Sequence, residues 1–459
     1  MSVNSVDFEP SLIADRTYTS RQLPTKVDVA ATLSFMVGLL YIIPGQAIVP
    51  NLTGAGRPAL LVALLLWCWW LMVRLNPWLT MVGPQPLRWA ALVYLLSLLL
   101  SYLAGLMRGL PSLESNAENL AVLQCFEFLG ILLTAADGIP NWQRLKGVLR
   151  VFVWCAGFMA LIGIVQSVLK YDPTPHLVLP GLTLKGEIDS LHPRGTGGLY
   201  RVAGTASHFI EFSAVMAMAV PFAIHFARFA TKRWQRRLAV AVAVGCGAAV
   251  PISISRTGIV ALAAAIVVMF PVWHWRLRYT FLVLGAGLTA ALSVVRPGLI
   301  GTVSAMFTGL NEDPSIQGRT DDYTRVGQWF NERPWLGRGP WTLIPDLYQG
   351  MVLDNEWLYT LVTQGLFGIV ALAAVHLTCI TLAGIALKRS TSIEDRHLCA
   401  ALIAAQVICI LVEGTVDAFY YTTYSMTFAL LAGLCGAVWR FTHPARTVRT
   451  SAVRRFIRG

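Results

Sequence analysis

Five arginines and a small set of acids are the residues of this chain that could do chemistry. A guanidinium group is a permanent cation whose planar fork of donors matches a phosphate or a diphosphate. A carboxylate or an imidazole held in a dry pocket can take a proton from a hydroxyl group. Together, the two kinds of group could bind an anionic leaving group and activate an attacking alcohol. The five arginines are Arg201, Arg256, Arg319, Arg325 and Arg338.

The most prominent candidate acid is Asp354. It opens the run Asp354-Asn355-Glu356-Trp357, which stands directly before a long apolar segment. Asp354 is the first candidate for a general base, or for a group that orients an acceptor hydroxyl. Glu356 and His208 are the next candidates.

Two pairs of polar residues have helical spacing. His208 and Glu211 open one apolar segment three residues apart, and Glu413 and Asp417 stand four apart near the end of another. Residues at these spacings lie on one face of a helix, so each pair is expected to share a face. The alternative role for each acid is an ion pair with one of the arginines. Glu127 stands in the middle of an apolar segment and is expected to be structural, paired with an inward polar group.

The composition excludes a soluble domain as the scaffold for these residues. Hydrophobic residues make up 56% of the 459 residues and charged residues only 13%, about half of what a soluble domain carries. Lipid must therefore cover much of the surface. Apolar stretches of bilayer length recur about a dozen times, which predicts an all-α polytopic membrane protein. The expected spans lie at about 29–48, 58–73, 89–107, 119–136, 151–169, 207–227, 238–251, 257–272, 280–294, 357–387, 398–417 and 423–438.

The basic residues predict how these spans are oriented. If the N-terminus lies inside, the inner segments carry two thirds of the 36 Lys and Arg residues, as the positive-inside rule requires. Both termini are then cytoplasmic, with tails at 1–28 and 441–459. The net charge of +12 reflects this topology and contact with the anionic lipid of the bilayer. No nucleic-acid partner is expected, because the basic residues lie in short inner loops rather than on one face of a domain.

Two long outer segments interrupt the series of spans. One lies near 170–206, and the other, at 295–355, separates the spans in 29–294 from those in 356–440. Loops of this length are uncommon and usually functional, so the function is expected on the outer face. Apolar residues recur with helical spacing at 300–310 and 319–331, which predicts short amphipathic helices in the larger loop.

The larger loop also contains a run rich in aromatic and basic residues. Residues 331–341 include Trp335, Arg338 and Trp341, and aromatic faces beside arginines suit a sugar. Tryptophans at a membrane interface also form aromatic belts, and this alternative stays open for Trp335 and Trp341. The outer arginines are a sharper signal, because a cation near an outer membrane end usually has a partner. That partner is a nearby acid, a lipid headgroup or an anionic ligand such as a diphosphate.

The residues that usually bind metal ions do not form a pattern here. Asp321 and Asp322 are adjacent rather than alternating, and they are expected to pair with Arg319 or Arg325. The eight cysteines fall inside predicted spans without metal-binding spacing. They are expected to be buried apolar residues, and neither a metal nor another cofactor is expected.

In these features the chain resembles the O-antigen ligase and polymerase superfamily, bacterial membrane glycosyltransferases that take glycans from undecaprenyl diphosphate. The resemblance rests on about twelve spans with both ends inside and on the order of several short motifs. It covers residues 195–440 well and the first five spans only in outline. The motifs are Arg201 to Gly204, Ser255-Arg256-Thr257-Gly258, Arg319, Arg325, Trp329-Phe330, Pro334-Trp335-Leu336-Gly337-Arg338-Gly339, and Asp354-Asn355-Glu356-Trp357-Leu358 with Gly365 and Gly368.

The resemblance implies a fold, a reaction and a place in the cell. The fold is GT-C-like and multi-pass, in a bacterial inner membrane, with the active site on the outer face. The donor is a glycan on undecaprenyl diphosphate, the acceptor is a sugar hydroxyl, and the anomeric carbon is inverted without a metal ion. Asp354, Arg256 and Arg201 are the catalytic candidates. The substrate-binding candidates are Arg319, Arg325, Arg338, Asn355, Glu356, Trp357, His208 and Trp335.

One departure bears on the branch of the superfamily. The ligases that attach O-antigen to lipopolysaccharide typically have a His, taken to be catalytic, at the position of Asp354. An Asp there resembles the exopolysaccharide and capsule polymerases, so polymerisation of a cell-surface polysaccharide is expected. Transfer of the glycan en bloc to a different acceptor is one alternative, and a transporter or flippase for polysaccharide lipids is another. Whether a chain-length regulator acts with the protein stays open.

Overall fold

The computed structural model describes residues 28–52, 54–75, 84–185, 191–194, 199–308, 314–348 and 352–444. At residues 192–194, 306, 308 and 314–322 only the backbone is described. Most of the two expected tails, 1–28 and 441–459, lies outside these residues. The long helices are α2 (Val29–Ile42), α3 (Pro58–Leu75), α4 (Pro86–Arg108), α5 (Ser112–Gly138), α6 (Trp142–Leu169), α7 (Phe209–Phe229), α8 (Arg233–Ile252), α9 (Arg256–Met269), α10 (Trp275–Val295), α13 (Glu356–Arg389), α14 (Ile393–Glu413) and α15 (Thr422–Phe441).

Shorter elements lie between the long helices. Two antiparallel ladders join β1 to β2 and β3 to β4, and in the second ladder Arg201 lies opposite His192. Two further helices, α11 and α12, follow α10 in the larger loop. The short elements are β1 (Ala47–Ile48), η2 (Thr174–Leu177), β2 (Thr183–Leu184), β3 (Leu191–Arg194), β4 (Leu199–Val202), η3 (Phe270–Val272), α11 (Leu299–Thr308), α12 (Pro314–Glu332), η5 (Pro345–Leu347) and η6 (Ala418–Tyr420).

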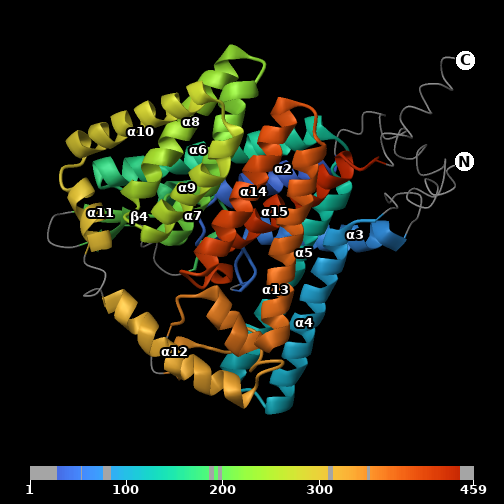
Figure 1. Cartoon of the computed structure of the whole chain (residues 1–459). Helices are drawn as coiled ribbons and strands as arrows, with labels where there is room; N and C mark the ends of the chain where they lie inside the picture. The colour runs from blue at the N-terminus through green and yellow to red at the C-terminus, as the bar shows by residue number, and fades with distance from the viewer. Residues whose placement is uncertain are drawn as a thin grey trace, which may run out of the picture.

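The long helices confirm an all-α polytopic membrane protein. Within the described residues, 10 helices are long and apolar enough to cross a bilayer, and shorter apolar helices cover Val29–Ile42 and Arg256–Val272. Each span expected from the sequence coincides with one of these helices. α15 and α7 lie at the centre of the bundle, because 94% and 89% of their apolar windows are buried. α10 lies at its edge, with 6% buried (Figure 1).

Local sequence signals set the ends of several helices. Asp28 and Asn141 cap α2 and α6, each accepting a hydrogen bond from a backbone amide three residues on, at 2.9 and 3.0 Å. Such caps satisfy amides that have no partner inside the helix. α4 starts with Pro86. Proline has no amide hydrogen, and the amides of the first turn have no partner within the helix, so nothing is lost there. The helix stops at Gly109, whose φ of 75° is a left-handed value that suits glycine.

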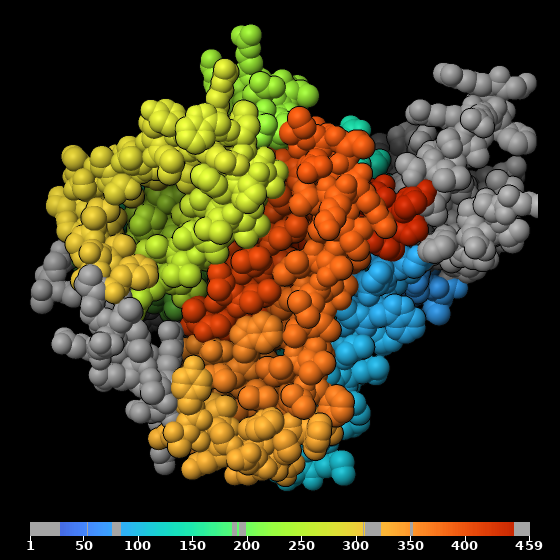
Figure 2. Space-filling view, viewed as in Figure 1, coloured from blue at the N-terminus to red at the C-terminus, as the bar shows by residue number. Residues whose placement is uncertain are grey.

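The segment between α10 and α13 covers one end of the bundle, called the loop end below. α12 packs on the start of α13 through Val326, Leu353 and Val362, which are buried together. Figure 1 shows α12 crossing the bottom of the bundle, and in Figure 2 the orange surface of this segment continues into that of α13. The loop is therefore packed against the spans rather than extended away from them.

A break in α13 receives part of this loop. Gly365 has φ 67° and ψ −164°, values that glycine adopts without steric cost. Residues 334–339 dock at the break through backbone hydrogen bonds. The amide of Gly339 donates to the carbonyl of Thr363 (2.9 Å), and the amide of Leu366 donates back to the first residue of the docked run (2.8 Å). The motif at 334–339 therefore ties the loop to the bundle at a fixed position.

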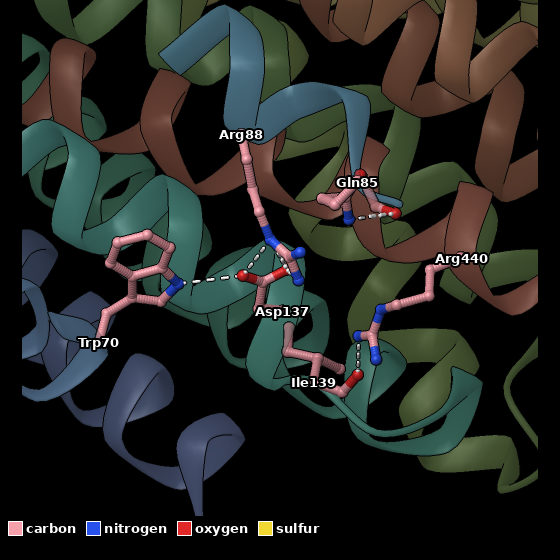
Figure 3. A network of polar contacts seen from close by, with 7 residues as sticks. Trp70, Gln85, Arg88, Asp137, Ile139 and Arg440 are labelled. Atoms are coloured by element: carbon pink, nitrogen blue, oxygen red, sulfur yellow. Dashed lines mark hydrogen bonds and ion pairs between the residues drawn. The ribbon is translucent and has the colours of Figure 1, made fainter. Parts of the chain in front are cut away.

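A polar network closes the opposite end of the bundle (Figure 3). Arg88 pairs with Asp137 through Nε (2.9 Å) and Nη2 (2.8 Å), and Nε1 of Trp70 donates to the same carboxylate at 3.0 Å. Gln85 donates to a backbone carbonyl of α15 at 3.2 Å, and Arg440 donates to the carbonyl at the end of α5. Side chains from α3, α4, α5 and α15 thus meet in one set of bonds.

Replacing Asp137 by alanine is expected to destabilise the protein. The Arg88 and Asp137 side chains are only 16% and 12% exposed, so the variant leaves a cation without its carboxylate in a poorly hydrated place. We expect a loss of roughly 3 kcal/mol in the free energy of unfolding, measured as a lower thermal midpoint in detergent. Glu394→Gln is the control, with an expected change below about 1 kcal/mol, because Lys146 keeps a second acid, Asp395. Equal shifts for the two variants would contradict the expectation.

Candidate active site

A cavity of about 450 Å³ lies at the loop end, within the range of small-molecule sites of about 300–1,000 Å³. We call it the loop-end cavity. Its walls come from α5, α12, the segment between α12 and α13, the start of α13, and the turn between α14 and α15. Its lining residues are Ala117, Trp329, Trp341, Leu343, Ile344, Pro345, Tyr348, Val352, Leu353, Asp354, Glu356, Tyr359, Asp417, Tyr420 and Tyr421.

Asp354 and Glu356 both line this cavity, and Asn355 fixes the backbone between them. Oδ1 of Asn355 accepts a hydrogen bond from the amide of Leu358 at 3.1 Å, which caps α13. Nδ2 of Asn355 donates to the carbonyl of Gly414 at 3.2 Å. One side chain therefore sets where α13 begins and ties that start to the turn after α14, which places Asp354 at the cavity.

Two buried acids bind backbone amides. Glu356 accepts from the amide of Phe419 at 3.0 Å and from the hydroxyl of Thr360 at 3.2 Å. Glu211 accepts from the amide of Thr423 at 2.6 Å and from the next amide at 3.2 Å. Amide donors at a helix start have no partner within the helix, so these carboxylates position η6 and α15. The sequence analysis gave ion pairs with arginines as the alternative role of these acids. In the structure, Glu356 and Glu211 accept hydrogen bonds from backbone amides.

Glu413 and Asp417 do not share a helical face, so that expectation is wrong. α14 ends at Glu413. Residues four apart share a face only within a helix, and Asp417 lies beyond the end of this one. Glu413 is buried, lies 2.8 Å from Nε2 of His376 and accepts from the hydroxyl of Tyr424 at 3.2 Å. Asp417 lies in the turn after the helix and lines the loop-end cavity. Only the second of these acids belongs to the candidate site.

The pKa of the Asp417 carboxyl is raised by its position in the cavity wall. Burial raises the pKa of its carboxyl to about 7, and the nearby charge of Asp354 adds to the increase. Burial disfavours the charged form of a carboxyl, and so does a second carboxylate. Asp417 therefore keeps a proton at pH values where an ordinary aspartate has lost it.

This proton makes the stability of the protein depend on pH. Between about pH 4 and 7 the folded chain holds a proton on Asp417 that the unfolded chain has released. Stability therefore falls as pH rises through this window. Asp417→Asn removes the loss, so its free energy of unfolding relative to the wild type should be higher at pH 8 than at pH 5, by on the order of 2 kcal/mol. The measurement is denaturation in detergent at the two pH values. Asp346→Asn, at an exposed loop position, should show no such difference. A shift for Asp417→Asn that is equal at both pH values would refute the assignment.

Arg256 occupies the first position of α9, behind the cap residue Ser255. The turn before it is tightly constrained, because Ile254 has a φ of 53°, which is rare for a β-branched residue. Oγ1 of Thr257 and Oγ1 of Thr415 lie 2.9 Å apart, so the start of α9 touches the turn that carries Asp417. The N-terminus of a helix favours an anion, and an arginine there adds to this preference.

Arg201 is connected to the cavity by a row of rings. Its guanidinium carbon lies 4.3 Å from the ring centroid of Phe209. The rings of Phe209 and His208 are 4.0 Å apart, and His208 stacks on Tyr421 at 5.2 Å. Nδ1 of His208 also accepts from the amide of Ile210 at 3.3 Å, which caps α7. His208 thus lies behind a lining residue of the cavity, and Arg201 lies one ring further away.

The starts of α7 and α9 are direct neighbours. A Cβ placed on Gly258 would lie 2.4 Å from the Cβ of Ser213, so the first turns of the two helices pack at a contact that only glycine allows. This contact brings Arg201, beside the start of α7, and Arg256, at the start of α9, to the same side of the cavity. Neither arginine is among the residues that line it.

Arg338 lies behind the aromatic wall of the cavity. It pairs with Glu332 at 3.0 Å and donates to the hydroxyl of Tyr348 at 3.3 Å. Its guanidinium carbon lies 5.8 and 5.7 Å from the ring centroids of Trp329 and Tyr348. These contacts make Arg338 a support for two aromatic lining residues.

The remaining candidates whose side chains are described lie outside the lining. Arg325 is on the exposed face of α12. Trp335 is 61% exposed and lies 6.1 Å from Phe367. Nε1 of Trp357 donates to the carbonyl of Ile410 at 3.3 Å, which joins α13 to α14. Only the backbone is described for Arg319, Asp321 and Asp322.

The titratable groups outside the cavity bear on whether the protein could hold a metal ion or a cofactor. The described residues contain no group of three or more His, Cys, Asp or Glu side chains that could hold a metal ion. All eight cysteines are free, and of these only Cys68 is exposed. Glu127 is buried in α5, and among the described residues its Oε1 has no hydrogen-bond partner. The polar partner expected for Glu127 is therefore not found at this oxygen.

The tyrosines of the cavity lining were not predicted from the sequence, whereas Trp341 belongs to the run that was predicted to suit a sugar. Tyr348, Tyr359, Tyr420 and Tyr421 all face the cavity together with Trp341, whose φ of 59° is left-handed. Three of these tyrosines lie close in the sequence to acids that were already candidates. Tyr359 follows Glu356 by three residues, and the two adjacent tyrosines follow Asp417 within four. Counting aromatic residues around the candidate acids would have found these three.

Comparison with known families gives a match over part of the chain. Residues 241–373 match the O-antigen ligase family, a region that runs from α8 into α13 and contains Arg256, Arg338 and Asp354. No curated protein matches the chain. The match does not separate ligases from polymerases. With its many apolar helices, the chain is a multi-pass membrane protein, and its residues 241–373 are similar to the O-antigen ligase family.

Proposed function

We propose that the protein transfers a glycan from an undecaprenyl-diphosphate-linked donor to a sugar hydroxyl, at the outer face of a bacterial inner membrane. The observation that carries this proposal is the loop-end cavity, in which Asp354 stands among six aromatic side chains. Pockets with aromatic walls and a few convergent polar groups are typical of small-molecule sites. The loop end is assigned to the outer face because two thirds of the basic residues belong to the segments at the other end.

In the proposed reaction, Asp354 takes the proton of the acceptor hydroxyl while its oxygen attacks the anomeric carbon of the donor. The bond from that carbon to the diphosphate oxygen breaks on the opposite side, so the configuration inverts. The products are a new glycosidic bond, a protonated Asp354 and free undecaprenyl diphosphate. Arg201 and Arg256 stabilise the negative charge that grows on the leaving group, a task that a divalent ion performs in other glycosyltransferases.

The other candidates act around these three residues. Asn355 and Glu356 hold the start of α13 and η6, which sets the position of Asp354. His208 and Arg338 support the lining residues Tyr421 and Tyr348. We assign Arg319, Arg325 and Trp335 to the binding of a growing glycan that extends beyond the cavity. Trp357 joins α13 to α14.

Polymerisation is favoured over transfer en bloc, because an aspartate stands where the ligases have a histidine. The second candidate is ligation to a different acceptor, which the description of the matching family favours. Both candidates use the same site and the same bond changes, and they differ only in what supplies the hydroxyl. A transporter would move the lipid-linked glycan without forming a glycosidic bond.

An in vitro reaction separates these functions. The purified full-length protein in nanodiscs is given a lipid-diphosphate-linked oligosaccharide, and the products are sized on a gel and by mass spectrometry. We expect a ladder of multiples of the repeat, with free undecaprenyl diphosphate released in step with each new bond. A single transfer that requires an added acceptor would indicate a ligase. Unchanged donor, under conditions that keep the protein folded, would refute the proposal.

A further inference from the structure

Gln166 is a buried polar residue near the end of α6 that the proposed reaction does not use. Its side chain is 0% exposed. Oε1 of Gln166 accepts a hydrogen bond from the amide of Gly204 at 2.8 Å, and Nε2 donates to the carbonyl of the same glycine at 3.0 Å. One side chain thus satisfies both backbone polar groups of one residue. A buried backbone group without a partner is costly, so these two bonds fix where Gly204 lies relative to α6.

Steric contacts hold Gly204 from two further sides. Its φ of 60° is left-handed, which suits glycine. A Cβ placed on it would lie 2.8 Å from Cε2 of Phe212 and 2.9 Å from the carbonyl oxygen of Met159. The position of the backbone at Gly204 is therefore set by a ring of α7, by the backbone of α6 and by the side chain of Gln166.

Gly204 follows Arg201 by three residues, in the turn between β4 and α7. Val202 and Ala203, which join the two residues, are both fully buried. The ladder of β3 and β4 holds the backbone of Arg201 opposite residue 192. A displacement of Gly204 is thus transmitted to Arg201 through a short and tightly packed segment.

The same glutamine connects this turn to the start of the smaller outer loop. Nε2 of Gln166 also donates to Oδ1 of Asp172 at 2.9 Å. Oδ1 of Asp172 in turn accepts from the amide and the hydroxyl of Thr174, at 3.0 and 2.8 Å, where η2 begins. Gln166 is therefore the side chain at which α6, the outer loop near 170–206 and the turn after Arg201 meet.

We propose that Gln166 is a positioning residue for Arg201: its two bonds to Gly204 set the direction from which the guanidinium group reaches the diphosphate. This inference rests on the proposed function, because that function assigns Arg201 to the leaving group. Gln166 itself touches no substrate, since its side chain is completely buried. A displacement of about 1 Å in a group that acts on the transition state is enough to lower a rate by about 100-fold.

Gln166→Met tests the proposal, because methionine keeps the length of the side chain and removes its bonds to Gly204. The full-length protein is assayed in nanodiscs of neutral lipid, with the thermal midpoint checked. We expect kcat to fall about 10- to 100-fold and the KM for the acceptor to stay within about threefold. Gln85→Met is the matched control. Gln85 is also buried and donates to a backbone carbonyl, but at the opposite end of the bundle, so its kcat should stay within about twofold of the wild type.

A cycle with Arg201→Ala separates positioning from a general loss of structure. If Gln166 acts through Arg201, Gln166→Met should lower kcat by less than about twofold once the arginine is gone. Losses that multiply would overturn the proposal. Gln166→Glu keeps the acceptor for the amide of Gly204 and takes the place of the methionine variant if that variant does not fold. A protein that folds with neither substitution would also overturn the proposal, because Gln166 would then be needed for the fold itself.

Binding of inorganic pyrophosphate gives a second measurement that needs no turnover. Once the donor bond has broken, the leaving group carries its full charge, and pyrophosphate reproduces that charge without the lipid. We expect Gln166→Met and Arg201→Ala each to weaken its binding at least about fivefold, and the double variant to weaken it no further than the stronger single variant.

The two measurements distinguish failure of this inference from failure of the proposed function. If the wild type forms no glycosidic bond but pyrophosphate binding follows the expected pattern, the proposed function fails and the positioning role stands. If glycan is transferred while the losses of the two variants multiply, the function stands and the positioning role fails. A wild type that neither transfers glycan nor binds pyrophosphate would refute both.

Discussion

Asp354→Asn is expected to lower the turnover of glycan transfer by at least about 100-fold. Asparagine keeps the size and the hydrogen-bonding reach of the side chain, but it cannot take a proton from the acceptor hydroxyl. A positioned general base contributes typically 10²–10⁴-fold to a rate. The cavity around it should change little, because the cap at Asn355 and the bonds of Glu356 do not depend on the lost charge. The KM for the acceptor should therefore stay within about threefold.

The measurement is the initial rate of product formation in nanodiscs, at equal protein and with the thermal midpoint checked. Asp346→Asn serves as the matched control, since it removes the same charge at an exposed place in the loop. Asp417→Asn separates proton transfer from charge at mildly acidic pH, because this acid shares the cavity and, with its pKa raised to about 7, keeps its proton there. A loss of less than tenfold in Asp354→Asn would assign this residue to orientation alone, with the departure of the diphosphate limiting the rate.

The spans could be predicted from the sequence because a bilayer imposes their length and composition. A chain in lipid must satisfy its backbone within helices, so hydrophobicity alone located elements as different as α3, which is largely exposed, and α15, which is almost wholly buried. α11 and α12 also lie where the spacing of apolar residues predicted helices. What these patterns do not contain is which helices touch.

The site depended on such contacts. The run at 334–339 looked like an exposed surface for a sugar, but its amides bind the broken turn of α13 at Gly365. The sequence around 334–339 does not indicate that this run binds a segment about thirty residues further along the chain. Ala117 of α5 lines the cavity, although the resemblance reached the first five spans only in outline. Helix packing, rather than local pattern, decides both placements.

The pair Glu413 and Asp417 illustrates the limit of spacing as a guide. Four residues mean one face only while the helix continues, and α14 ends at the first member of the pair. Hydrophobicity places a span to within a few residues, and that margin is enough to move an acid from a helix face to a turn. Asp354 was easier to place, because Asn355 is a strong cap signal directly before α13.

Arg256→Ala is expected to lower turnover by about 10²–10³-fold, the cost of removing one preorganised group that stabilises charge in the transition state. Arg201→Ala should have a loss of similar size. The charge on the diphosphate grows as its bond to the anomeric carbon breaks, so the effect should appear in kcat more than in the affinity for the donor. Arg256→Lys should recover only part of the rate, since an ammonium group lacks the fork that binds two oxygens at once.

Arg237→Ala is the control, because it removes an exposed arginine from the opposite end of the protein, at the start of α8. Its turnover should stay within about twofold of the wild type. The double variant of Arg201 and Arg256 tests whether both act on one leaving group. The packing of Gly258 on Ser213 places the two helix starts side by side, and residues that share a ligand show losses that do not multiply. A double variant that loses as much as the product of the single losses would mean that the two arginines act independently, and that a common diphosphate site is not what joins them.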